Sequence, residues 1–112
     1  MNVARPTVEW LTDARHYASE ARRLVGTAQT PPSDDDTLAF RYCLVVVGEA
    51  LDWVPSDILS QEANIPWRKV ITLRHRLVHG YWLVDEGILI QIARNDIEPL
   101  IDALDRLIIK AT

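Results

Sequence analysis

Cysteine and long apolar runs are both scarce in this chain of 112 residues. Its one cysteine, Cys43, cannot form an intrachain disulfide, and it excludes a metal site built from cysteine pairs. A lone thiol within an apolar run is typical of a small core residue. The lack of disulfides is typical of proteins that reside in the reducing cytoplasm. No apolar run approaches the roughly 20 residues that cross a bilayer, and residues 1–6 lack the apolar core of a secretory leader. We therefore expect one domain over residues 1–112, without membrane association.

Acidic residues outnumber basic ones, 16 to 12, which gives a net charge of −4. A protein that coats nucleic acid nonspecifically needs clustered Lys and Arg, so the overall balance excludes that class. Residues 63–84 differ, because they contain Arg68, Lys69, Arg74 and Arg76 and no carboxylate. Two interpretations remain open. The first, which a bare charge cluster favours, is that these cations lie on a helix surface and pair with acidic residues elsewhere in the chain. The second is that they form a basic patch that binds a short stretch of phosphate backbone.

The apolar residues recur at helical spacing, which predicts an all-α chain with short connections. A first helix is expected from a cap at Thr7 to Gly26, and a second helix over residues 35–53 follows the cap Ser33. The remaining helical stretches are expected over residues 58–63, 66–79 and 85–93, and from a cap at Asn95 or Asp96 onward.

Arg74 lies where an arginine is unexpected. In the helix over residues 66–79, the apolar side chains span one broad arc, and Arg74 falls in its middle. The arc consists of Trp67, Val70, Ile71, Leu73, Leu77 and Val78. A guanidinium in such a place must be paired or face a cleft, because an uncompensated buried charge is very costly. Glu49 of the second helix is the expected partner, and it would hold Arg74 while other donors reach a phosphate.

His79 stands at the expected end of the same helix. A histidine there interacts favourably with the negative helix end and suits general acid or base chemistry near neutral pH. The alternative is that His79 only interacts with the helix dipole at this end and has no catalytic role. Gly80 is expected to take the left-handed position after the helix, with the Tyr81 ring folding back near Arg76. His75 is a second polar site group or a solvated residue, and its spacing alone favours the latter.

One chain supplies few acid–base groups for cleaving RNA. The reaction needs a base for the 2′-hydroxyl, an acid for the leaving 5′-oxygen and charge stabilisation at the phosphorane. Two copies of Arg74 and His79 across a two-fold axis would supply all three, and two-fold dimers are the commonest oligomers. Four tryptophans offer apolar area for such an interface, namely Trp10, Trp53, Trp67 and Trp82. The residues therefore predict a composite site in a homodimer.

Residues 65–71 (Ile-Pro-Trp-Arg-Lys-Val-Ile) and 74–81 (Arg-His-Arg-Leu-Val-His-Gly-Tyr) resemble the sequence signature of HepT-like toxins of the HEPN superfamily. Residues 47–50 upstream and 95–100 downstream follow in the family's order, so the resemblance covers roughly residues 7–110. It implies an antiparallel bundle of four to five helices that dimerises with its R-x4-H motifs facing each other across a cleft. It also implies a metal-independent endoribonuclease without a cofactor, the toxin of a toxin–antitoxin system.

By position, the resemblance assigns phosphate stabilisation to Arg74 and acid–base catalysis to His79. His75 fits the polar residue that follows the arginine in this superfamily, and we add Arg76 as an RNA-binding residue beside it. Tyr81 matches the motif tyrosine, to which an MNT-type nucleotidyltransferase antitoxin adds AMP in some systems; the added charge and bulk would obstruct RNA. The alternative function is a non-catalytic helical module that binds RNA or nucleotide, or that docks the nucleotidyltransferase. A third interpretation is a purely structural helical dimer.

Overall fold

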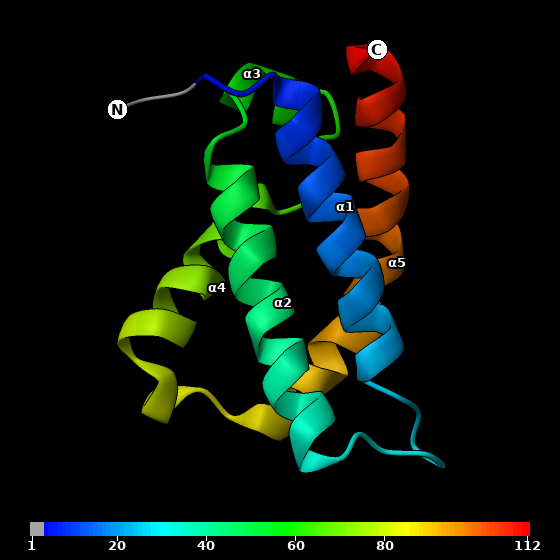
Figure 1. The fold of residues 1–112 in the computed structure, drawn as a ribbon, viewed down its shortest axis with the longest axis vertical. Helices are drawn as coiled ribbons and strands as arrows, with labels where there is room; N and C mark the ends of the chain where they lie inside the picture. The colour runs from blue at the N-terminus through cyan, green and yellow to red at the C-terminus, as the bar shows by residue number, and fades with distance from the viewer. Residues whose placement is uncertain (1–3) are drawn as a thin grey trace.

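The computed structural model describes residues 4–112, and all regular structure within them is helical. The elements are α1 (Thr7–Leu24), α2 (Asp34–Asp52), α3 (Ser56–Leu59), α4 (Trp67–His79), the 3-10 turn η1 (Tyr81–Leu83) and α5 (Glu86–Ala111). α1 and α2 run antiparallel, α5 packs along α1, and α4 packs along the other side of α2 (Figure 1). The predicted all-α antiparallel bundle of four to five helices is confirmed. The expectation for the first six residues falls partly on residues 1–3, which lie outside the described part.

Small side chains on α1 let its neighbours approach closely. Ala14, Ala18 and Ala21 are fully buried together with Leu11, at three- and four-residue steps along one stripe of the helix. The largest fully buried side chains of the core are Leu11, Phe40, Val47, Leu51, Leu104 and Leu107. Burial of each such side chain contributes about 1.5–3 kcal/mol. This core fixes α1, α2 and α5 against one another, and α4 lies at its edge.

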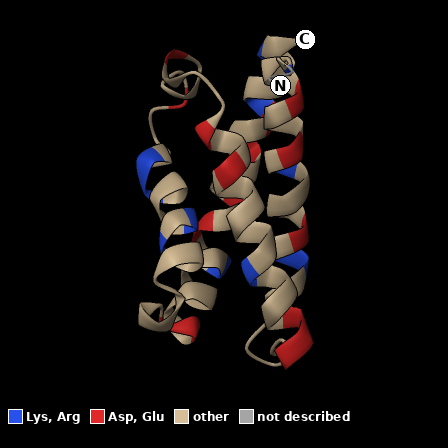
Figure 2. Ribbon diagram, turned by 60° about the vertical axis from the view of Figure 1, so that its left-hand side comes forward, with Lys and Arg blue, Asp and Glu red and all other residues tan. Residues whose placement is uncertain are grey.

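Ion pairs join α5 to the elements around it, where acidic and basic segments intersperse along the bundle (Figure 2). Arg15 of α1 lies 2.9 Å from the Asp105 carboxylate. Arg106 donates to Glu62, in the loop before α4, at 2.7 Å. That hydrogen bond holds the pKa of the Glu62 carboxyl below its usual range. The loop that leads into α4 is therefore tied to α5 by a charged hydrogen bond.

Two helix ends follow the predicted signals and a third departs from them. The Ser33 hydroxyl accepts from the Asp36 backbone N–H at 3.0 Å, and the Asp36 side chain accepts from the Ser33 backbone N–H in return. Gly26 takes the left-handed φ of 61° expected after α1. The prediction that Thr7 caps α1 is wrong, because Pro6 occupies the N-cap position and Thr7 is the first helical residue. The proline fixes φ at −57°, so the chain enters the helix one residue early.

α5 is one helix of 26 residues where the sequence predicted two. Asn95 and Asp96 lie inside it, so the predicted cap there is wrong. Asp85 is the cap, and its carboxylate accepts from the Ile88 backbone N–H at 2.9 Å. Pro99 lacks an N–H, yet the helix continues through it because buried apolar side chains on both sides pack in the core. Tertiary packing overrides the local stop and start signals.

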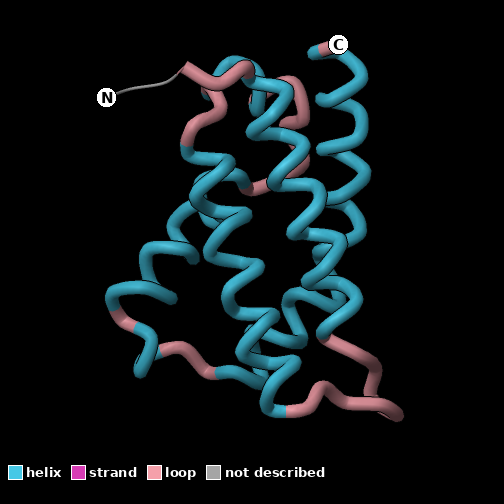
Figure 3. Tube along the Cα trace, in the orientation of Figure 1, coloured by secondary structure: helices cyan, strands magenta, loops and turns pink. Residues whose placement is uncertain are grey.

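The end of α4 also departs from the prediction. Gly80 has φ −143°, outside the left-handed region, and its N–H donates to the Arg76 carbonyl at 2.9 Å. The chain continues past a short loop into η1 (Figure 3). The prediction that the Tyr81 ring folds back on Arg76 is therefore wrong, and the ring instead meets the Trp82 ring edge-on at 5.4 Å. α3 likewise begins earlier than the turn predicted over residues 58–63, directly after a proline.

Candidate active site

A close approach between Gly48 of α2 and Arg74 of α4 defines the inner side of α4. Gly48 is buried, and a Cβ added there would collide with the Arg74 Cβ and lie 3.4 Å from the Val70 carbonyl oxygen. Glycine inside a helix costs about 0.5–1 kcal/mol relative to alanine. Here it is required, because any larger residue would push α4 away from α2.

Arg74 makes the ion pair expected with Glu49, since its Nη2 lies 2.8 Å from the Glu49 Oε2. The Arg74 side chain is 32% exposed, and its Nε is buried without a hydrogen-bond partner. Glu49 is held from its other oxygen, because the Trp53 indole N–H donates to Oε1 at 3.4 Å. The guanidinium is thus oriented by one carboxylate and keeps further donors for an anion.

The supports of this ion pair extend to the amino-terminal end of α1. The Trp53 ring stacks on Trp10, with centroids 5.5 Å apart, and the Arg5 guanidinium lies 4.1 Å over the Trp10 ring. Reasoning from the sequence missed the roles of Gly48 and Trp53. One signal for Trp53 was available, because it follows Glu49 by four residues and therefore shares its side of α2.

His75 and His79 point outward from α4. Both are exposed, and their ring centroids are 4.7 Å apart on successive turns. Arg74 and His79 leave the helix in directions about 140° apart, because five residues rotate by roughly 100° each. Among the described residues, no hydrogen bond or ion pair joins Arg74 to His79. One protomer therefore supplies both groups on the same helix without bringing them together.

Large apolar side chains lie exposed in the segment around His79. They are Val78, Tyr81, Trp82, Leu83 and Ile88. The expectation that Val78 belongs to the buried arc of α4 is wrong, since 46% of it is exposed. Val78 projects within that arc but lies in the last turn of α4, where no described element covers it fully. Apolar surface next to a candidate catalytic histidine is suited to contact with another molecule.

A groove of about 770 Å³ separates α4 from α5. Arg68, Lys69 and Arg76 line its α4 side, while the α5 side is mostly apolar, with Leu89 and Ile92, and includes the carboxylate of Asp96. The sequence favoured pairing of the basic window with acids elsewhere. That interpretation is wrong for these three cations, which make no ion pair among the described residues. Arg76, predicted to bind RNA, thus faces open groove.

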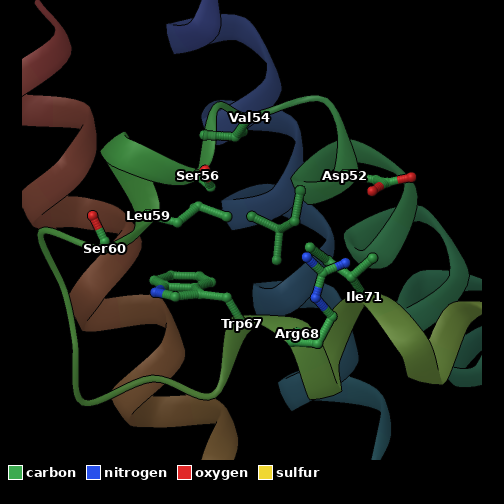
Figure 4. Close-up of a pocket in the computed structure, with 9 residues that line it drawn as sticks. Asp52, Val54, Ser56, Leu59, Ser60, Trp67, Arg68 and Ile71 are labelled. Atoms are coloured by element: carbon green, nitrogen blue, oxygen red, sulfur yellow. The ribbon is translucent and has the colours of Figure 1, made fainter.

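A second, smaller pocket of about 380 Å³ lies between the end of α2, α3 and the start of α4. Figure 4 shows Leu59 and Trp67 on one side of it and Arg68 on the other. Neither this pocket nor the α4–α5 groove is lined by Arg74 or His79. In the single chain, the half-buried Arg74 and the exposed His79 thus lie outside both of these hollows.

Residues 4–112 contain no group of three or more His, Cys, Asp or Glu side chains placed to hold a metal ion. Cys43 is buried, and burial raises the pKa of its thiol, which disfavours the reactive thiolate. In the same part of the chain, no helix is both long and apolar enough to cross a membrane. The histidine and arginine of the R-x4-H motif both belong to α4, and Tyr81 belongs to the segment that follows it.

The chain is similar to several known proteins. A protein of Thermococcus cleftensis provisionally named ribonuclease HepT is 33% identical over 64 residues, 57% of this chain and 58% of that protein. A provisionally named RNase of Methanocaldococcus jannaschii is 32% identical over 61 residues, 51% of this chain and 56% of that protein. One from Caldanaerobacter subterraneus is 23% identical over 100 residues, 89% of each chain.

The matches to the first two relatives span little more than half the length of those proteins. No solved structure matches the chain significantly. The model of the family described as Ribonuclease HepT-like matches residues 14–107, which include α2, α4 and nearly all of α5. The chain therefore belongs to the HepT-like family.

Proposed function

We propose that this protein is a metal-independent endoribonuclease that works as a homodimer and serves as the toxin of a toxin–antitoxin system. Arg74 carries the proposal: its ion pair with Glu49 at 2.8 Å orients a partly exposed guanidinium on the same helix that presents His79. Membership of the HepT-like family and the provisional names of the relatives support RNA as the substrate. The family match supports cleavage rather than binding alone.

In the proposed reaction, the His79 imidazole of one protomer takes the proton from the RNA 2′-hydroxyl, whose oxygen attacks the adjacent phosphorus. The His79 of the other protomer donates a proton to the leaving 5′-oxygen. Arg74 stabilises the negative charge that develops on the phosphorane oxygens. Glu49 is a positioning residue, since its carboxylate pairs with the Arg74 guanidinium and orients it.

A second copy of the chain is required by this scheme, because Arg74 and His79 point about 140° apart on one helix. The exposed apolar segment beside His79 supports contact with that copy. Tyr81, Trp82 and Leu83 are each more than 60% exposed, and such side chains are typical of interface cores. A two-fold axis near the end of α4 would bring both His79 residues to one cleft.

Replacement of His79 by alanine tests the assignment. The variant should lose RNA cleavage by a factor of roughly 100 or more, the range that loss of a general acid or base produces. His16→Ala is the matched control, because His16 is exposed on α1 and distant in sequence from the motif. Both variants should keep wild-type helicity and dimer mass, and chelator should leave wild-type cleavage unchanged. Full cleavage by His79→Ala would contradict the proposal.

Mixed dimers test the composite site. If each site needs His79 from both protomers, a subunit-exchanged mixture of equal parts wild type and His79→Ala should retain about one quarter of the activity, the fraction of dimers with two intact chains. If each chain works alone, about one half should remain. A result of one half, with subunit exchange verified by mass spectrometry, would rule out the composite site.

Tyr81 is the proposed point of control by an MNT-type nucleotidyltransferase antitoxin. Its side chain is 61% exposed, directly after the loop that ends α4, so an enzyme can reach its hydroxyl. An AMP group added there carries negative charge and bulk at the cleft mouth. Incubation with such a nucleotidyltransferase and ATP should add the mass of AMP to the wild type and not to Tyr81→Phe. Addition at another residue would refute the assignment.

The second candidate is a non-catalytic module that binds RNA or nucleotide, or that docks the nucleotidyltransferase. It is favoured by the position of Arg74 and His79 in the single chain, because both lie outside the two hollows described above. Binding of RNA by the wild-type dimer without any cleavage would select this function over the first.

A further inference from the structure

Three of the four cations on α4 make no ion pair among the described residues, whereas most cations elsewhere in the described part of the chain do. Among the described residues, six of the eight Lys and Arg residues outside α4 form an ion pair with a carboxylate. On α4 only Arg74 does so, and Arg68, Lys69 and Arg76 have no such partner. Carboxylates are not scarce, because the chain has 16 of them for 12 cations. α4 itself contains no Asp or Glu, so only basic segments appear along it (Figure 2).

The unpaired cations share one side of α4 with the proposed acid–base residue. At about 100° per residue, Arg68, Lys69, Arg76 and His79 fall within an arc of about 100°, and Thr72 lies inside it. The rise of about 1.5 Å per residue puts Arg68 roughly 16 Å from His79 along the helix axis. That length accommodates up to about five nucleotides at the roughly 3.4 Å per nucleotide of a stacked strand.

The two ends of this arc differ in charge. The first turn of α4 carries no acidic residue and no side-chain cap, so the positive end of the helix stays uncompensated. Beyond His79, the chain instead reaches Asp85 and Glu86 at the start of α5. Asp85 caps α5 and Glu86 pairs with Arg41, just as Glu62 before α4 pairs with Arg106, whereas the open amino terminus of α4 attracts phosphate. The charges therefore favour a polyanion that extends from His79 toward Arg68.

We infer that a single strand of RNA runs along this side of α4, from the cleaved phosphate at His79 past Arg76 to Arg68 and Lys69. The inference rests on the proposed function and adds the path of the substrate. The three cations are positioning residues that contact phosphates away from the cleaved bond. The bases would pack against the apolar side chains, such as Ile92, on the α5 side of the adjoining groove. Three cations and one carboxylate, Asp96 of α5, line this groove, and α4 itself carries no acid, so the net positive charge selects RNA as the occupant.

RNA binding without cleavage tests the path. In the His79→Ala background, Arg68→Ala/Lys69→Ala should weaken binding of a labelled single-stranded RNA of about 12 nucleotides roughly tenfold. The slope of log K against log salt should become shallower by about 1.4, because each phosphate that a cation neutralises on a single strand contributes about 0.7. Arg68→Lys should keep the slope. Lys110→Ala, which removes an unpaired cation from the far end of α5, should change neither quantity.

Cleavage kinetics separate this inference from the proposed function. With His79 intact, Arg68→Ala/Lys69→Ala should raise KM roughly tenfold with little change in kcat, because remote phosphate contacts hold substrate and transition state alike. If the wild type cleaves RNA and this variant has unchanged KM and salt slope, the path is wrong and the ribonuclease stands. Dissociation of the variant dimer would mean that the surface joins two copies, which also overturns the path. If the wild type neither binds nor cleaves RNA, the proposed function itself fails.

Discussion

Gly48→Ala is the substitution that tests most directly how the fold positions the candidate site. The added methyl group would collide with the Cβ of Arg74, and it would also lie 3.4 Å from the Val70 carbonyl oxygen. These atoms belong to or adjoin the backbone of α4, so a side-chain rotation cannot relieve the collision. α4 must move away from α2, and Arg74 must move with it relative to Glu49.

The expected magnitude follows from two opposing effects. Overpacking of a close helix contact costs about 1–3 kcal/mol, and a contact between two Cβ atoms belongs at the upper end. Alanine is favoured over glycine inside a helix by up to about 1 kcal/mol. The net loss of unfolding free energy should be about 2 kcal/mol. For a domain of this size, that loss corresponds to roughly 8 °C in melting temperature. Displacement of Arg74 by about 1 Å should reduce kcat by up to 100-fold.

Gly87→Ala is the matched control, because Gly87 is also helical and a Cβ there would meet only the Asp85 Oδ1, at 3.4 Å. It should raise the unfolding free energy, by up to about 1 kcal/mol. Urea unfolding followed by circular dichroism and RNA cleavage under saturating substrate measure the two effects. A Gly48→Ala protein that gains stability like the control and cleaves RNA at the wild-type rate would refute the link between Gly48 and Arg74.

Two further predictions concern ion pairs. Glu49→Gln should lower kcat roughly tenfold while changing the unfolding free energy by less than about 1 kcal/mol. The reason is that an ion pair this exposed contributes little to stability and mainly orients Arg74. An unchanged kcat together with a large loss of stability would assign the pair a structural role only. The hydrogen bond from Arg106 lowers the pKa of the Glu62 carboxyl from its ordinary 4.5. Above pH 4.5 the charged carboxylate therefore stabilises the fold. This stabilisation is lost as the pH falls through the lower pKa that Glu62 has in the folded protein. The urea midpoint of the wild type should therefore drop more steeply than that of Glu62→Gln below about pH 4.5; parallel pH profiles would contradict this.

The central ion pair could be predicted from sequence because burial leaves few alternatives. A guanidinium in the middle of an apolar arc needs a carboxylate, and the buried stretch of the second helix offers Glu49. The structure places the two 2.8 Å apart. The approach of α4 to Gly48 was not predictable in the same way. It depends on the distance between two helices, which periodicity within either helix does not determine.

Local end signals failed where packing opposed them. A cap was predicted at Asn95 or Asp96, yet α5 continues through both residues and through Pro99, because its buried side chains pack in the core on both sides of the proline. Gly80 predicted a left-handed turn, yet φ is −143° because the chain proceeds into η1. Capping rules describe what a helix end requires. They do not decide whether the chain ends the helix there.

The two sides of α4 have different proposed roles, and this difference predicts how AMP on Tyr81 would inhibit the protein. The inner side fixes Arg74 through Gly48 and Glu49, and a group added at the exposed Tyr81 is not in contact with that support. The outer side carries the cations that would hold RNA. An AMP phosphate on Tyr81, two residues after His79, would therefore add negative charge that repels RNA at the cleaved phosphate and would leave the fold unchanged. Inhibition of this kind should appear as weakened RNA binding with an unaltered melting temperature. A fall in melting temperature would instead place the effect of the modification on the fold.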